Sequence, residues 1–274
     1  MKYSVNQATV RRLRTVVCSI GATTCLSVMV MAGNLTVASA SDRDEAYHQD
    51  YIYGEPLEPT DAWRIARGGR LYDKWYAVTD VDKPKKTHSA WPASNTKQKG
   101  DTTWRCKSCH GWDFMGRDGK YASGSYKTGI TGVRGVEGLS VDKIHAILMN
   151  KVHGYTHQMI PKNDMLHLSF FLSEGQYDIT PYVNKDGTVN GNKERGAAMF
   201  QNTCAACHGF DGRALNWGDE KNPSYIGTEA QGNPWEIMAK IRHGHPATEM
   251  IAYAAFPMQD AADVLAYAQT LPAK

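Results

Sequence analysis

"CKSCHG" occupies residues 106–111, and "CAACHG" occupies residues 204–209. Each stretch has two cysteines three positions apart and a histidine directly after the second cysteine. Cysteines at this spacing occur in redox dithiols, in zinc sites and at covalently attached haems. These three kinds of site make different demands on the rest of the chain, so the surrounding sequence decides among them.

The first forty residues have the organisation of an export signal. Four Lys and Arg residues and no acidic residue precede Asp42. An apolar run over residues 16–32 follows, and then the small-residue pattern "ASA" at residues 38–40. We predict a signal peptide over residues 1–40 that is cleaved after Ala40. The alternative is an uncleaved membrane anchor, because the apolar run approaches the roughly 20 residues that span a bilayer.

Removal of this segment changes both the charge and the cysteine count. The chain has 31 Lys and Arg residues and 28 Asp and Glu residues, and four of the basic residues lie in the segment. The remaining 27 basic and 28 acidic residues give a net charge of −1. We therefore expect no nucleic-acid binding. Cys18 and Cys25 leave with the segment, so the four cysteines of the two stretches are the only thiols left.

A c-type haem is the one site that uses every residue of both stretches. A redox dithiol is expected beside a βαβ pattern, which the sequence lacks, and a four-cysteine zinc site uses closely spaced pairs. In a c-type haem, the two cysteines form thioethers and the adjacent histidine binds the iron. We predict two covalently bound haem c groups, attached by Cys106 and Cys109 and by Cys204 and Cys207, with the iron ligands His110 and His208.

With these motifs in place, the chain resembles two fused class I cytochrome c domains. The second half carries the resemblance best, in "ERGAAMFQNTCAACHGFDG" (residues 194–212), "NPWEIMAKIRHGHPATEM" (233–250) and "DAADVLAYAQTLP" (260–272). Gly196 and Phe200 share a helical face, and we expect Gly196 to let the last helix approach near Tyr267. Asp260 is the expected N-cap of that helix.

The first half repeats the pattern in "RGGRLYDKWY" (residues 67–76), "VDKIHAILMNKVHG" (141–154) and "MLHLSFFL" (165–172). It also has an insert over residues 77–103, which contains five lysines. The insert could dock an acidic partner, although a solvated loop packed by Trp91 is the plainer interpretation. The resemblance implies an all-α fold of two tandem cytochrome c-like domains, each wrapped around one covalently attached haem. We place the domains at residues 41–175 and 193–274, with a linker over residues 176–192.

The same resemblance implies a distal methionine for each iron. Met250 fits this role for the second haem, with Met258 as the competitor. Met159 fits best for the first haem, and His157 and Met165 are its rivals. A bis-histidine first haem would follow if His157 were the ligand.

Other positions have expectations of their own. His153 and His243 are equivalent in the two halves, and we expect them to share a role other than ligation. In the family, a proline carbonyl accepts a hydrogen bond from the proximal histidine, and Pro223 matches that position for His208. The first half has no proline there, so the sequence leaves open what orients His110.

These features predict a periplasmic dihaem cytochrome that transfers single electrons between a donor and an acceptor protein. The setting we expect is a respiratory or inorganic-oxidation chain, with the protein possibly a subunit of a larger oxidoreductase. We expect no catalytic residue, and membrane contact only if the N-terminal segment stays uncleaved. The alternative is a haem enzyme, similar to thiosulfate dehydrogenases or peroxidases, with an open or bis-histidine first haem.

Overall fold

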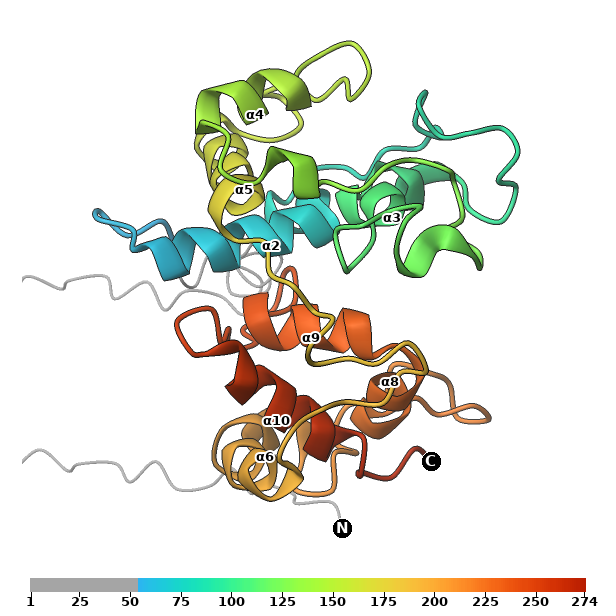
Figure 1. Ribbon diagram of the computed structural model, residues 1–274, viewed down its shortest axis with the longest axis vertical. Coiled ribbons are helices and arrows are strands. Elements are labelled where there is room, and N and C mark those ends of the chain that lie inside the picture. Colours follow the sequence, from blue (N-terminus) through green and yellow to red (C-terminus); the bar gives the residue numbers. More distant parts are fainter. Residues whose placement is uncertain (1–53) are drawn as a thin grey trace, which may run out of the picture. The chain divides into compact units, whose positions relative to one another are not determined.

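The computed structural model describes residues 54–274, and this part of the chain is built from helices and loops (Figure 1). Within these residues, β-structure is confined to two isolated bridges, Gly116 with Thr131 and Val183 with Val189. The predicted all-α class is confirmed for this region. The predicted export signal lies outside the described residues. No helix within them is both long and apolar enough to cross a membrane.

Both halves of the described chain contain helices. The first half, residues 54–175, contains α2 (Asp61–Val78), α3 (Cys106–His110), α4 (Val141–Leu148) and α5 (Lys162–Glu174). The second half, residues 176–274, contains α6 (Lys193–Met199), α7 (Ala205–His208), α8 (Ile226–Gly232), α9 (Pro234–His243) and α10 (Met258–Ala268). A π-helical turn, η4 (Phe200–Cys204), joins α6 to α7.

The first helix of each half crosses the last helix of that half at a glycine. In the second half, a Cβ on Gly196 would lie 1.8 Å from the carbonyl oxygen of Asp263, so no other residue fits there without moving α10. This confirms the predicted approach of α10, although the contact lies one turn before Tyr267. Tyr267 instead packs on Phe200, with ring centroids 5.4 Å apart.

In the first half, Gly68 provides the equivalent close approach. A Cβ on Gly68 would lie 2.3 Å from the Cβ of Phe171 on α5. The adjacent Gly69 faces His243 of α9 instead. The two adjacent glycines of α2 thus serve different neighbours, one in each half of the chain.

The N-terminus of α10 differs from the prediction. Its N-cap is Pro257, and Asp260 lies inside the first turn. Asp260 is buried and forms an ion pair with Arg195 of α6. The expected cap is therefore wrong, because this carboxylate binds a neighbouring helix rather than the end of its own.

A buried ionic cluster joins α2 to α9. The carboxylate of Asp73 accepts hydrogen bonds from Arg105 and from Lys240. Close by, Arg70 donates a hydrogen bond to the carbonyl oxygen of His243 at 2.8 Å. Because Arg105 directly precedes Cys106, this cluster ties the first cysteine motif to a helix of the second half.

Candidate metal centres

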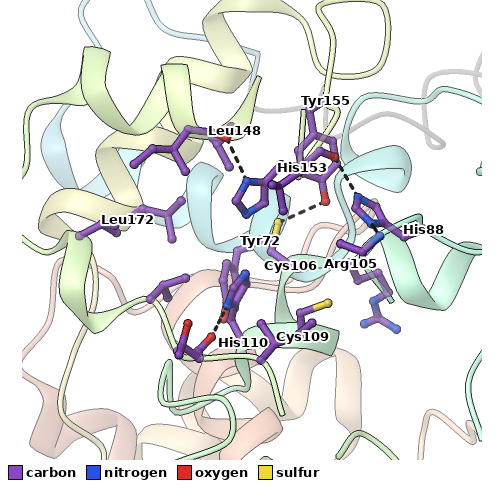
Figure 2. A pocket seen from close by; sticks show the side chains of 18 of the residues that line it. Tyr72, His88, Arg105, Cys106, Cys109, His110, Leu148, His153, Tyr155 and Leu172 are labelled. Atoms are coloured by element: carbon purple, nitrogen blue, oxygen red, sulfur yellow. Dashed lines mark hydrogen bonds between the residues drawn. The ribbon is translucent and has the colours of Figure 1, made fainter. Parts of the chain in front are cut away.

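The first cysteine motif lies along a cavity of about 390 Å³. Helix α3 presents Cys106, Cys109 and His110 to it, as Figure 2 shows. The rest of the wall is mainly apolar, and includes Ile130, Val133, Val136, Ile144, Ile147 and Leu148. A mostly apolar cavity of this size with a few polar groups is typical of a cofactor site.

His110 has a fixed orientation and tautomer. Its Nδ1 lies 2.7 Å from the carbonyl oxygen of Thr131, which can only accept a hydrogen bond. Nδ1 therefore carries the proton, and Nε2 keeps a free lone pair. Burial lowers the pKa of His110 to about 4, so the ring is neutral, as a metal ligand must be.

The Thr131 carbonyl is held by backbone pairing between residues 114–117 and 130–133. Arg117 N–H donates to the Ile130 carbonyl, and Val133 N–H donates to the Phe114 carbonyl, each at 2.8 Å. Gly132 makes this pairing possible, because a Cβ there would lie 2.0 Å from the Phe114 oxygen. The first half thus orients its histidine with a threonine carbonyl and needs no proline.

A second histidine faces His110 across the cavity. The ring centroids of His110 and His153 are 6.3 Å apart, with an angle of 34° between the ring planes. His153 Nδ1 donates to the Ile147 carbonyl at 3.0 Å, which leaves its Nε2 with a free lone pair as well. Figure 2 shows both histidines and both cysteines around the same space.

The distal ligands predicted for the first haem lie elsewhere. Among the described residues that line the cavity, neither Met159 nor His157 occurs. His157 is exposed and stacks on His145, with centroids 5.3 Å apart, while Met159 is partly buried against the hydrophobic core. Met165 is fully buried in α5. The structure thus brings His153, and not these three residues, opposite His110.

The insert contributes to this cavity through His88. Its ring is buried, lines the cavity and packs on Trp104, with centroids 4.2 Å apart. His88 Nε2 donates to the carbonyl oxygen of His153 at 2.8 Å. Trp91 is buried, as the sequence indicated, but the insert is more than a solvated loop.

The second cysteine motif spans η4 and α7. Cys204 is partly buried and Cys207 is exposed. The His208 ring lies between Phe200 and Trp217, at centroid distances of 6.4 and 5.8 Å. Burial lowers the pKa of His208, which favours the neutral form of this ring.

The predicted hydrogen bond from His208 to Pro223 is wrong for this structure. His208 Nδ1 is buried and has no hydrogen-bond partner within the described residues. The loop that contains Pro223 closes on itself instead, since Trp217 N–H donates to the Ser224 carbonyl at 2.9 Å. The side chain of Asn216 also accepts from the Ser224 N–H at 2.9 Å.

Met250 lies in the loop between α9 and α10. It lines a cavity of about 270 Å³ together with Trp63, Ala66 and Arg70 of α2. Its competitor Met258 is the first residue of α10 and packs against the core. Ligation of the second iron by Met250 stays a prediction.

The two cysteines of the first motif do not have the character of a redox dithiol. Burial raises the pKa of Cys106 to about 11 and that of Cys109 to about 12, whereas a redox dithiol needs an accessible thiolate. The four cysteines within residues 54–274 are free of disulfide bonds. Across residues 54–274, no three His, Cys, Asp or Glu side chains converge as they would in a zinc site.

Comparison with known proteins bears on the second half. Residues 191–267 match the family model for cytochrome C oxidase, cbb3-type, subunit III. No curated protein matches the chain. The matched region contains Cys204, Cys207 and His208 and supports a c-type cytochrome domain. Such a domain implies covalently bound haem c and electron transfer with redox partners.

Proposed function

We propose that the protein is an exported dihaem cytochrome c that transfers single electrons between a donor and an acceptor protein. Haem c is attached at Cys106 and Cys109 and again at Cys204 and Cys207. The cavity beside the first motif, which holds two cysteines and a neutral, oriented histidine, carries the proposal for the first haem. The family match supports the second haem.

Each group of residues fits a haem for its own reasons. The first cavity has an apolar wall, two thiols on one helix and the free Nε2 lone pair of His110. The second site has the same spacing of thiols and a neutral histidine between two aromatic rings. When bound, a haem supplies an iron that changes its charge by one electron. The chain attaches the haem, orients the proximal ring and excludes water.

The contacts between the halves support a carrier with two centres at a fixed separation. Arg105, next to Cys106, and Lys240 of α9 share the buried carboxylate of Asp73. Lys120 of the first half also lies over the ring of Trp235 in the second half, 3.8 Å from its centroid. A rigid pair of haems suits electron transfer, because the rate falls steeply with distance.

The proposed setting is the periplasm, in a respiratory or inorganic-oxidation chain. Export is supported by the N-terminal charge and apolar pattern, and by the attachment of c-type haem outside the cytoplasm. An enzymatic role similar to thiosulfate dehydrogenases would call for a further cysteine as ligand. A peroxidase-like role would call for an open iron, whereas His153 faces the first cavity.

Haem counting tests the proposal. An alkaline pyridine spectrum of the protein from the periplasmic fraction is expected to give two c-type haems per chain. The double variants Cys106→Ala/Cys109→Ala and Cys204→Ala/Cys207→Ala are each expected to lose one haem. Ala206→Ser, an exposed change inside the second motif, is the matched control and should keep both. A wild-type count of one or none refutes the dihaem proposal, and mass spectrometry shows whether cleavage follows Ala40.

A further inference from the structure

We infer that His153 is the second axial ligand of the first haem, so that this iron is held by two histidines. The inference rests on the proposed function, since it requires a haem at Cys106 and Cys109. An imidazole nitrogen binds a transition metal at about 2 Å and lies about 1 Å from its own ring centroid. Two imidazoles on opposite sides of one metal therefore have centroids about 6 Å apart. The observed distance between His110 and His153 is 6.3 Å.

Both rings are prepared for ligation in the same way. Each donates its Nδ1 proton to a backbone carbonyl, His110 to Thr131 and His153 to Ile147. Each therefore offers Nε2 as the free nitrogen. A hydrogen bond of this kind to the outer nitrogen fixes the ring and raises its basicity, as is usual for metal-bound histidines.

The backbone of His153 is fixed by contacts on both sides. Its N–H and that of Val152 donate to the side-chain oxygen of Asn150, at 3.0 and 2.9 Å. Its carbonyl accepts from His88 Nε2 at 2.8 Å. The other ring nitrogen of His88 accepts from the Ala90 N–H at 3.0 Å, so the tautomer of His88 is also set. A ligand presented from such a loop has little freedom to leave the iron.

His243, the equivalent residue of the second half, has a different environment. It is the last residue of α9 and is buried between Phe171 and Tyr177, with ring centroids 5.0 and 5.8 Å away. By contrast, α4 ends at Leu148, five residues before His153. The longer loop turns His153 into the first cavity, so the expected shared role of the two histidines does not hold.

Ligation by His153 has a functional consequence. An iron with two protein ligands has no open position for a substrate. Imidazole also stabilises ferric iron better than a thioether does, so a bis-histidine haem has a lower reduction potential than a histidine–methionine haem. If Met250 binds the second iron, the second haem has the higher reduction potential and holds the electron at equilibrium. The first haem, at lower potential, then passes electrons to it.

Near-infrared magnetic circular dichroism of the oxidised holoprotein tests the ligand. The wild type is expected to show one bis-histidine charge-transfer band, and His153→Ala to lose it. His157→Ala and Met159→Ala are the matched controls and should leave it unchanged. His153→Met should replace the band with a methionine–iron band and raise the potential of the first haem. Reduced His153→Ala should bind one more CO per chain than the wild type.

The outcomes separate the ligand from the cofactor. Haem is attached covalently through the cysteines, so the pyridine spectrum of each His153, His157 and Met159 variant should still show two haems. A wild-type count below two refutes the proposed function itself. With two haems present, a wild-type spectrum without a bis-histidine band overturns the ligand inference even if no variant folds. Loss of the band in Met159→Ala or His157→Ala, or its survival in His153→Ala, also overturns it.

Discussion

Replacing Asp73 with asparagine is expected to destabilise the contact between α2 and α9. Asp73 is 3% exposed, and its carboxylate binds both Arg105 and the buried ammonium of Lys240. Asparagine keeps the shape of the side chain but removes its charge, so two cations face each other without a counter-ion. Breaking a buried ion pair in this way costs about 3–5 kcal/mol.

Thermal unfolding of the holoprotein, followed by far-ultraviolet circular dichroism, measures the loss. For a folded unit of about 150–250 residues, each kcal/mol lowers Tm by about 2–4 °C, so we expect a fall of about 6–20 °C. Asp61→Asn is the matched control, because Asp61 is an exposed carboxylate of the same helix and pairs loosely with Arg64 at 3.9 Å. Surface pairs of this kind are worth about 0–1 kcal/mol. If the Tm of Asp73→Asn falls no further than the Tm of Asp61→Asn, the reasoning is refuted.

The pH dependence of the same variant gives an independent measure. Burial alone would raise the pKa of Asp73, but the charges of Lys240 and Arg105 hold it well below its usual range. Because the folded pKa is depressed, the stabilisation is fully present above the unfolded pKa of about 3.9 and is lost as the pH falls below it. The Tm difference between wild type and Asp73→Asn should therefore narrow from about pH 6 to about pH 3. A constant difference would contradict the assignment of the charge to Asp73.

Three further substitutions test the helix crossing and the first site. Gly196→Ala should lower the free energy of unfolding in urea by about 1–3 kcal/mol, because the methyl group meets a carbonyl of α10. Gly135→Ala is the control: its methyl group would meet nothing within 4 Å, so the free energy of unfolding should change little. Gly132→Ala should displace the carbonyl that orients the first proximal histidine. In potentiometric titration the potential of the first haem should then shift, and an equal shift of both haems would contradict this. His88→Ala should let CO bind the reduced first haem, whereas the exposed-residue control Lys83→Ala should not; equal binding by both variants rejects the positioning role.

Local sequence patterns predicted the parts of the fold that depend on neighbouring residues. The helical spacing of "DAADVLAYAQTLP" indicated α10, and Gly196 indicated that α10 lies close to α6. The prediction that Asp260 caps the helix was wrong because an aspartate carboxylate is suited both to capping a helix and to pairing with a buried cation. Only the position of Arg195, which lies on another helix, distinguishes the two roles.

The ligand environment was less accessible to sequence reasoning, because it depends on contacts between distant segments. The acceptor for His110 is the backbone carbonyl of Thr131. Every residue has such a carbonyl, so the sequence does not show which one accepts the hydrogen bond. Gly132 was the available signal, since the absence of a Cβ at this position allows the close backbone pairing. The distal ligand of the first haem was not predicted because His153 was aligned with His243 as an equivalent residue. The alignment did not show that α9 ends at His243 whereas α4 ends five residues before His153.

The first half departs from the cytochrome pattern in its insert over residues 77–103 and in its inferred histidine ligand. These two features are linked through His88. The insert brings His88 to the cavity, and His88 holds the carbonyl of His153, the inferred ligand. A half without the insert would lack this donor, and the carbonyl of His153 would lose the hydrogen bond that holds it. The insert and the change from methionine to histidine are then two parts of one arrangement. His88→Ala and His153→Ala should therefore affect the first haem in the same direction and leave the second haem unchanged.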